Sequence, residues 1–309
     1  MAYHLRPAIR SEAKPLIGLY SESGCGKTKS ALLLAKGFVG DMSKVGMIET
    51  EAGRGEVYAE DHVVGGYLVR PIRENFAPVE YGKAITDLEQ GGVKVGIIDS
   101  ASQEWEGANG VLGWAAKNQE EGKKGPLVWQ KPKMSHQSDF ILRLLQTPIS
   151  LVIICMRAKY PMKEVSKEGK KEWTRSEILE PKQADDILFE MMVHGWIDAQ
   201  HALHVTKYTT DDFRKIFIDG QPITVDTGKR LAEWAAGGAT QTKTDSPPPS
   251  SPAPKDEKED FAVIMARERK RLGDERFFGF LGANGYEKVE EITDRKKQIN
   301  IYRVMAEAK

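Results

Sequence analysis

A glycine-rich stretch at residues 21–28, S-E-S-G-C-G-K-T, combines residue types whose spacing suits the binding of phosphate. Gly24 and Gly26 let the backbone turn so that its N–H groups point inward at phosphate oxygens. Lys27 supplies a positive charge for the β- and γ-phosphates, and the Thr28 hydroxyl is placed to bind Mg²⁺. We therefore expect ATP and Mg²⁺ as cofactors. The predicted nucleotide-binding residues of this stretch are Ser23, Gly24, Cys25, Gly26, Lys27 and Thr28.

The flanks of this stretch support a phosphate-binding loop. Residues 15–20 are an apolar run of strand length, and residues 29–38 have the apolar periodicity of a helix. A helix that starts at the loop directs its positive end at the bound anion. Ser21 stands where such loops usually have their first glycine, and a small residue fits there. The alternative is a glycine-rich turn between a strand and a helix that binds nothing.

An acidic residue follows a second apolar run. Residues 93–98, V-K-V-G-I-I, predict a buried strand that leads directly into Asp99. A carboxylate in this position can share Mg²⁺ with the hydroxyl of Thr28. The alternative is an ordinary aspartate at the end of a strand.

Two further carboxylates lie in I-E-T-E at residues 48–51, after the strand predicted at 45–50. A carboxylate at this strand end can approach a water molecule that attacks the γ-phosphate, and so act as a general base. We prefer Glu51 to Glu49, because alternation puts both side chains on one face and Glu51 reaches further out. The alternative is a solvated glutamate in a loop.

Composition limits the class of protein. The chain has 309 residues, 45 basic and 45 acidic side chains, and two cysteines, Cys25 and Cys155. Balanced charge neither favours nor excludes a polyanionic partner, and two cysteines make no disulfide framework. No apolar run approaches the roughly 18–20 residues of a membrane span, and the first twelve residues lack the apolar core of a signal peptide. We expect a cytoplasmic protein with no membrane partner.

The order of elements predicts an α/β fold with a mostly parallel central sheet. Further strands are expected at 67–72 and 149–155, and helices at 78–90, 139–146 and 231–236. Residues 160–177 predict a β-hairpin or a mobile loop. Three antiparallel strands that close one edge of the sheet are expected at 190–197, 202–208 and 215–218.

The C-terminal part of the chain changes in composition. Residues 237–260 contain five prolines and no apolar periodicity, which predicts a disordered linker. Residues 261–309 predict a small helical module, with helices at 261–272, 277–281 and 294–306. The predicted domains are thus a core at 1–236, the linker and this module. The module is nearly balanced in charge, so a protein partner suits it better than DNA does.

The order of the phosphate-binding loop, I-E-T-E and I-I-D-S resembles that of the RecA family of P-loop ATPases. More narrowly, it resembles phage-encoded RecA-like ATPases of the single-strand annealing and recombinase group. The resemblance covers residues 15–236. It also includes the charged hairpin, the E-P-K-Q segment at 180–183 and V-T-K-Y at 205–208. It implies a RecA-like core that hydrolyses ATP.

The resemblance assigns roles to single residues. Lys27 would bind phosphate, Thr28 and Asp99 would bind Mg²⁺, and Glu51 would activate water. RecA has an Asn-Gln pair at the end of its sensor strand, where this chain has Met156 and Arg157, so signalling from ATP to DNA of the RecA type does not carry over directly. We predict that Arg157 contacts the γ-phosphate and that Lys207 reaches the nucleotide of a neighbouring subunit. The alternative for both is a surface cation.

RecA-like proteins hold DNA on the loops that follow the Walker B and sensor strands, which are 107–136 and 158–177 in this chain. Both segments interleave lysines with aromatic residues and carry net charges of +3 and +2, as counted from the sequence. Aromatic and cationic side chains together suit single-stranded DNA. The alternative for both segments is a solvated charged loop.

These features lead to one expectation of function and several alternatives. We expect a homo-oligomeric or filamentous ATPase that binds single-stranded DNA and promotes annealing or strand exchange in homologous recombination, encoded by a phage and acting in the bacterial cytoplasm. One alternative is a nucleotide-dependent DNA-binding scaffold with negligible turnover. A helicase loader and a small-molecule kinase are further alternatives; the kinase is disfavoured because the chain has no arginine-rich lid.

Overall fold

The computed structural model describes residues 13–167, 170–237, 265, 269–270, 273–286, 288–289 and 292. The chain divides into two compact units, residues 1–243 and 244–309. The predicted linker, apart from Gly237, lies outside the described residues, as do the helix expected at 294–306 and most of that expected at 261–272. In the second unit, α11 (Asp274–Ala283) covers the helix expected at 277–281 and packs Phe277 and Leu281 beside Met265 and Ile292.

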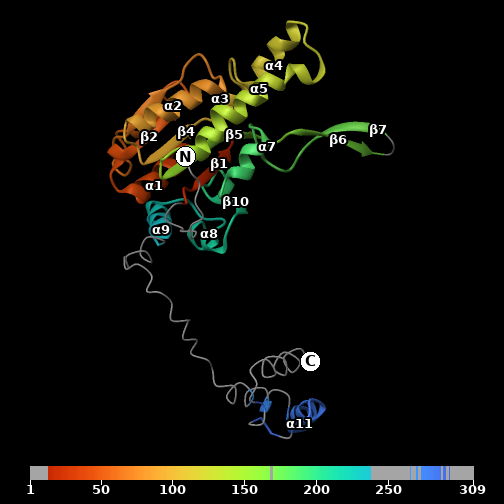
Figure 1. Cartoon of the computed structure of the whole chain (residues 1–309). Coiled ribbons are helices and arrows are strands. Elements are labelled where there is room, and N and C mark those ends of the chain that lie inside the picture. The colour runs from red at the N-terminus through yellow and green to blue at the C-terminus, as the bar shows by residue number, and fades with distance from the viewer. Residues whose placement is uncertain are drawn as a thin grey trace, which may run out of the picture. The chain divides into compact units, whose positions relative to one another are not determined.

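The first unit is built around a mixed, mostly parallel sheet, as the sequence predicts (Figure 1). Its described strands are β1 (Leu16–Ser21), β2 (Val45–Glu49), β3 (Leu68–Pro71), β4 (Val95–Asp99), β5 (Leu151–Lys159), β6 (Met162–Lys167), β7 (Lys170–Arg175), β8 (Glu180–Pro181), β9 (Val193–Ile197) and β10 (Leu203–Tyr208). Seven of these lie in the order β10-β9-β1-β5-β4-β2-β3, and β8 pairs with β5. The strand pairs from β9 to β3 are parallel, whereas β10 is antiparallel to β9.

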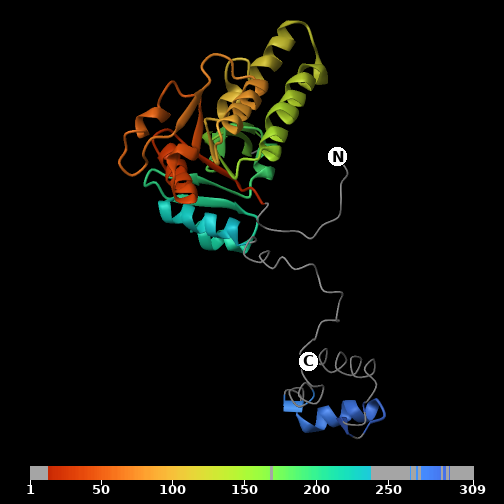
Figure 2. The same cartoon turned by 60° about the vertical axis from the view of Figure 1, so that its left-hand side comes forward.

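Helices cover both faces of this sheet (Figure 2). The described helices of this unit are α1 (Lys27–Val39), α2 (Pro78–Gln90), α3 (Ser102–Glu106), α4 (Val111–Glu120), α5 (Gln130–Ser135), α6 (Leu142–Gln146), α7 (Asp185–Glu190), α8 (Asp211–Ile216) and α9 (Val225–Ala236). Short 3₁₀ turns are η2 (Met42–Lys44), η3 (Gly55–Tyr58) and η4 (Gly125–Val128), and η5 (His136–Ile141) is π-helical. No described helix has the length and apolar character that a membrane crossing needs.

The alternation of side chains along the strands explains the two helical layers. On β1, Leu16 and Tyr20 join a buried cluster with α2, η5 and α6. The intervening Ile17 and Leu19 join a second cluster with α1, α8 and α9. Because both faces of the central strands are buried, these strands are near-continuous apolar runs, and that is why the sequence reveals them.

Helices α1 and α9 cross at a pair of glycines. A Cβ on Gly37 would lie 1.9 Å from the carbonyl oxygen of Val225, and a Cβ on Gly228 would lie 2.2 Å from that of Leu34. Any side chain at either position would therefore force the two helices apart. A capping box between Thr224 and Thr227 starts α9 well before the helix predicted at 231–236.

Two expectations about secondary structure are wrong. Residues 107–136 are not a loop: α4, η4 and α5 form a helical projection, in which the Asn118 amide donates to the carbonyl of Val128 at 2.8 Å. The strand expected at 215–218 is also absent, because most of this segment belongs to α8 or its end. Helix α8 has acidic residues in its first turn and basic residues in its last turn, which suits the helix dipole.

The prediction for the edge of the sheet is partly wrong, whereas the predicted hairpin is present. Of the three antiparallel strands expected at the edge, β9 pairs in parallel with β1, and only β10 is antiparallel. The hairpin expected within 160–177 is present as β6 and β7, which extend away from the sheet (Figure 1).

Candidate functional site

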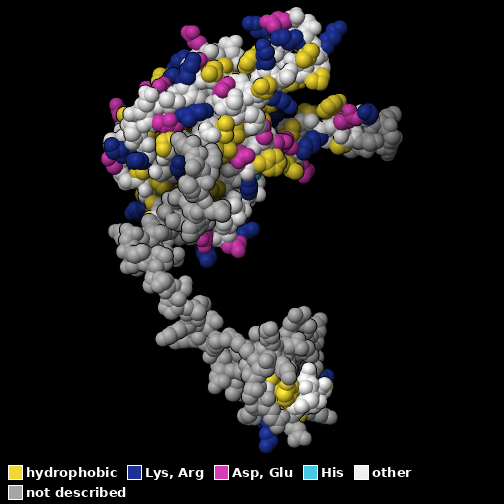
Figure 3. Space-filling model, viewed as in Figure 1, with side chains coloured by type: hydrophobic (Ala, Val, Ile, Leu, Met, Phe, Trp, Pro, Cys, Tyr) yellow, Lys and Arg dark blue, Asp and Glu magenta, His cyan; other side chains and the backbone are white. Residues whose placement is uncertain are grey.

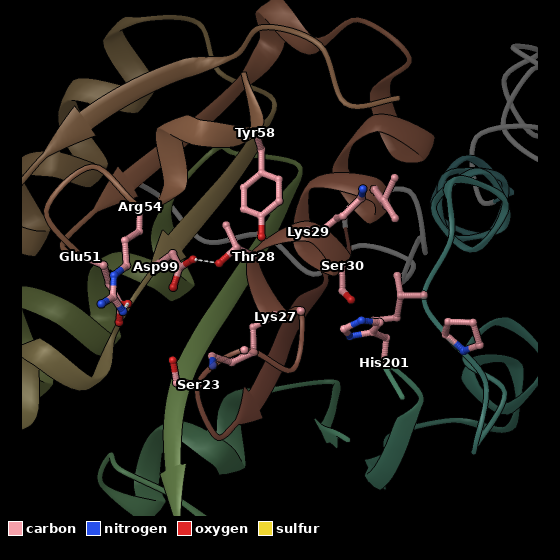
Figure 4. Close-up of a pocket in the computed structure, with 15 residues that line it drawn as sticks. Ser23, Lys27, Thr28, Lys29, Ser30, Glu51, Arg54, Tyr58, Asp99 and His201 are labelled. Carbon is pink, nitrogen blue, oxygen red and sulfur yellow. Dashed lines mark hydrogen bonds and ion pairs between the residues drawn. The ribbon is translucent and has the colours of Figure 1, made fainter. Parts of the chain in front are cut away.

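The glycine-rich stretch joins β1 to α1 at the carboxyl end of the sheet, as the sequence predicts. Gly24 and Gly26 have φ angles of 88° and 92°, in the left-handed region that disfavours other residues. Figure 4 shows Ser23, Lys27 and Thr28 of this loop among the residues that line a cavity. The cavity has a volume of about 530 Å³. In α/β folds, ligands bind outside the carboxyl ends of parallel strands, and this cavity lies there.

The ammonium group of Lys27 is held by its own loop. It donates to the Ser21 hydroxyl at 3.0 Å, to the Ser21 carbonyl at 3.3 Å and to the Glu22 carbonyl at 3.1 Å. Ser21 therefore gives Lys27 a side-chain partner that a glycine at this position would not provide. This contact positions the only lysine of the loop at the base of the cavity.

Thr28 and Asp99 come together from α1 and β4. The Thr28 hydroxyl donates to Oδ2 of Asp99 at 2.5 Å. Burial raises the pKa of Asp99 from 3.8 to about 6; the bond from Thr28 opposes this shift, and the charge of Glu51 adds to it. The peptide bond between Asp99 and Ser100 is cis. A buried carboxylate with a raised pKa gains from a nearby cation, which would favour its charged form.

The two glutamates of I-E-T-E lie in different environments. Glu49 ends β2 with 1% of its side chain exposed, and its carboxylate accepts from the backbone N–H of Glu51 at 2.7 Å and of Gly53 at 3.0 Å. Arg73 also donates to it. Glu49 is thus committed to holding the loop that follows β2.

Glu51 lies beyond the end of β2 and lines the cavity (Figure 4). Its Oε1 accepts from Nε of Arg157 at 2.8 Å, and its Oε2 lies 3.9 Å from Arg54. Strand alternation is not what separates the two glutamates, because Glu51 is outside the strand. What separates them is that the loop buries Glu49 and leaves Glu51 at the cavity.

Strand order explains how Arg157 reaches Glu51, although Arg157 does not itself line the cavity. Strand β5 lies between β1 and β4, with Arg157 in register with Ser21 and Cys155 in register with Asp99. The end of β5 is therefore flanked by the glycine-rich loop and by the aspartate. The guanidinium of Arg157 is partly exposed and pairs with Glu51.

Lys207 does not join these residues within one chain. It lies on β10, and its ammonium group donates to the carbonyls of Leu188 and Phe189 at the end of α7, at 3.2 Å and 2.8 Å. It does not line the cavity. Its predicted contact with a neighbouring subunit's nucleotide stays a prediction.

Several residues of the cavity wall have no sequence motif. These are Lys29, Ser30, Leu33, Arg54, Tyr58, His201, Pro222 and Ile223. They come from α1, the segment after β2, the turn between β9 and β10, and the segment before α9. Cys25, which the sequence grouped with the nucleotide-binding residues, does not line the cavity, but its carbonyl contacts the ring of His201 at 2.9 Å.

A buried polar network lies next to α3, the helix that follows Asp99 in the chain. The two ring nitrogens of His136 lie 2.8 Å from Glu104 and 3.2 Å from Asp186. Gln183 donates to the carbonyl of Ala101 at 2.9 Å and to Glu104 at 3.2 Å. The network joins α3, η5 and α7, and gives the E-P-K-Q segment a structural role.

The hairpin and the α4–α5 projection carry exposed aromatic and basic side chains (Figure 3). Trp173 is 65% exposed on β7, and the guanidinium of Arg175 stacks over Tyr160 at 4.5 Å. Lys133 lies over the ring of Trp129 at 5.9 Å. Salt bridges with glutamates engage two of the hairpin lysines, Lys163 and Lys171.

No protein-family model matches the chain, and no curated protein matches it at a significant level.

Proposed function

We propose that this chain is a Mg²⁺-dependent ATPase with a RecA-like core. The observation that supports this most is the meeting of Lys27, Thr28 and Asp99 at one cavity, with Glu51 on its wall. Three cations and two carboxylates line the cavity, which suits a polyanion bound together with a metal ion. The cations are Lys27, Lys29 and Arg54, and the carboxylates are Glu51 and Asp99.

The donor atoms at the base of the cavity fit Mg²⁺. The Thr28 hydroxyl and the Asp99 carboxylate are hard oxygen ligands, and Mg²⁺ is commonly held by one or two protein oxygens together with substrate phosphates and water. Bound there, Mg²⁺ would neutralise charge on the β- and γ-phosphates. The short bond between Thr28 and Asp99 keeps the two ligands adjacent before the metal arrives.

Three side chains divide the remaining work of hydrolysis. Lys27 binds the β- and γ-phosphates once it leaves the loop oxygens that hold it. Glu51 accepts a proton from the attacking water, and Arg157 offers its planar guanidinium to the γ-phosphate. Because Arg157 now pairs with Glu51, γ-phosphate must compete for the arginine, and its success would free the carboxylate for water.

We further propose that the ATPase acts on single-stranded DNA, in annealing or strand exchange during homologous recombination. The exposed Trp173 and the stacked Tyr160 and Arg175 suit bases and phosphates of a single strand. An oligomer or filament, a protein partner for the second unit and a phage origin in the bacterial cytoplasm are parts of the same proposal, and they rest on the resemblance to the RecA-like group.

A second candidate is a DNA-binding scaffold that binds ATP and hardly hydrolyses it. The pairing of Glu51 with Arg157 favours it, since a carboxylate engaged by a cation is a poor general base. Steady-state hydrolysis separates the candidates, measured with and without an oligothymidine strand on wild type, Lys27→Ala and the exposed α9 control Lys229→Ala. The ATPase requires turnover that Lys27→Ala abolishes and the control keeps. Tight binding without turnover would favour the scaffold.

A further inference from the structure

His201 occupies a fixed position beside the glycine-rich loop. It lies in the tight turn between β9 and β10 with a φ angle of 67°. The carboxylate of Asp198 holds this turn by accepting from the backbone N–H of Gln200 at 2.9 Å and of Ala202 at 2.8 Å. The turn therefore directs the imidazole toward the loop.

The contact with the loop determines which ring nitrogen carries the proton. Nδ1 of His201 lies 2.9 Å from the carbonyl oxygen of Cys25. A carbonyl only accepts, so Nδ1 is the donor, and in the neutral ring Nε2 is left as an acceptor. A Cβ on Gly26 would lie 2.9 Å from Nδ1, so the ring rests directly on the loop backbone.

The cavity has two ends of different character. One end holds Lys27, Thr28, Asp99 and Glu51, and suits a triphosphate with its metal. The wall also includes the apolar side chains of Leu33, Pro222 and Ile223. Leu33 lies about 7.5 Å further along α1 than Thr28, at 1.5 Å per residue. Figure 4 shows His201 on the side of the loop away from Glu51. In a nucleotide, the sugar lies between the phosphates and the base.

We infer that His201 recognises the sugar of the nucleotide, with Nε2 accepting a hydrogen bond from a ribose hydroxyl. This inference rests on the proposed binding of ATP and adds to it a preference for ribonucleotides. His201 would thus bind with both nitrogens, Nδ1 to the protein and Nε2 to the ligand. The contact would let the chain distinguish ATP from a deoxynucleotide that has the same phosphates and base.

Two substitutions of His201 distinguish the contribution of Nδ1 from that of Nε2. The side-chain amide of His201→Asn can stand where Nδ1 stands, and asparagine tolerates the positive φ, so the bond to Cys25 is kept and Nε2 is lost. In His201→Gln the longer side chain places its amide near Nε2. His62→Asn is the matched control, because His62 is exposed and does not line the cavity.

The experiment measures dissociation constants of ATP, 2′-deoxyATP, 3′-deoxyATP and inorganic tripolyphosphate. Wild type and His62→Asn should bind ATP about 3–10-fold more tightly than the analogue that lacks the contacted hydroxyl, as one neutral hydrogen bond allows. His201→Asn should bind ATP and that analogue equally, with its affinity for tripolyphosphate unchanged. His201→Gln should retain part of the preference.

Two outcomes would overturn the inference and leave nucleotide binding intact. One is equal affinity of wild type for ATP and both deoxy analogues. The other is an equal loss of affinity for ATP and tripolyphosphate in His201→Asn, which would mean that the ring only supports the loop. Failure of wild type to bind any of these ligands would overturn the proposed function and the inference together.

Discussion

The substitution Glu51→Gln separates catalysis from binding at this site. It keeps the shape of the side chain and removes the charge that would accept a proton from water. If Glu51 is the general base that we propose, its carboxylate is needed in the transition state and hardly at all for ground-state binding. Hydrolysis should fall by about 10²–10⁴-fold, the range typical of a general base, which corresponds to about 3–5 kcal/mol of activation free energy.

The contacts of Glu51 indicate that stability should change little. Its side chain is 18% exposed, and its partners Arg157 and Arg54 are 40% and 74% exposed. Ion pairs of this kind contribute about 0–1 kcal/mol, so the free energy of unfolding should fall by no more than that. Affinity for ATP should stay within a few-fold of wild type, and ATP-dependent DNA binding should persist or last longer.

Glu49→Gln is the matched control. It is the same substitution two positions earlier in the chain, but it should lower stability and leave the chemistry of hydrolysis unchanged. Glu49 is nearly inaccessible and accepts from two backbone N–H groups and Arg73. An amide cannot accept all of these bonds, so the free energy of unfolding should fall by about 2–4 kcal/mol. Any loss of hydrolysis in this variant should follow the loss of folded protein.

Single-turnover hydrolysis, ATP binding and urea unfolding on the same preparations provide the assay. Normal hydrolysis by Glu51→Gln, together with a large loss in folded Glu49→Gln, would mean that the wrong glutamate was chosen. Normal hydrolysis by both variants would refute the RecA-like role of I-E-T-E. The resemblance would then reduce to the glycine-rich loop and Asp99.

Three more predictions concern charge, DNA and domain structure. Because the pKa of Asp99 is raised from 3.8 to about 6, its stabilising contribution is present below pH 3.8 and lost as the pH rises through 6. Asp99→Asn should therefore increase the free energy of unfolding by about 3 kcal/mol at pH 8, in the presence of a metal chelator, and by almost nothing below pH 4. Urea unfolding at both pH values tests this prediction. A lower free energy of unfolding of the variant at pH 8 would contradict it. Trp173→Ala should weaken oligothymidine binding about 5–100-fold and leave ATP hydrolysis without DNA unchanged. Fluorescence anisotropy measures the binding, and equal affinities of the variant and wild type would mean that the hairpin does not bind DNA. A chain ending at residue 236 should melt cooperatively and hydrolyse ATP, and loss of cooperative melting in calorimetry would disprove the predicted boundary.

The sequence predicted the parts of the site that are local. Gly24, Gly26, Lys27 and Thr28 act through one turn between a strand and a helix, so their spacing alone predicts their arrangement. Asp99 was found because an apolar run buried on both faces ends directly before it. These residues are recognisable because short-range geometry and chemistry coincide in them.

Residues brought together by the fold left no such pattern. His201 reaches the loop across about 175 positions of sequence, through a turn whose shape depends on Asp198. The network of Glu104, His136 and Gln183 joins α3, η5 and the segment between β8 and α7, and each residue alone resembles an ordinary polar residue of a helix or loop. The helix α4 was missed because its few apolar residues join neither buried cluster of the sheet, and the helix contacts α3, η4 and α5 instead.

The glycine contact between α1 and α9 has a consequence for biosynthesis. Since α9 ends roughly 200 residues after α1 begins, translation at roughly 5–20 residues per second separates their emergence by about 10–40 s. Strand β1 also lacks its two partners in the sheet until β5 and β9, which are both made later, have been synthesised. The segment with Lys27 and Thr28 is thus among the first parts of its unit to leave the ribosome and among the last to be fully enclosed.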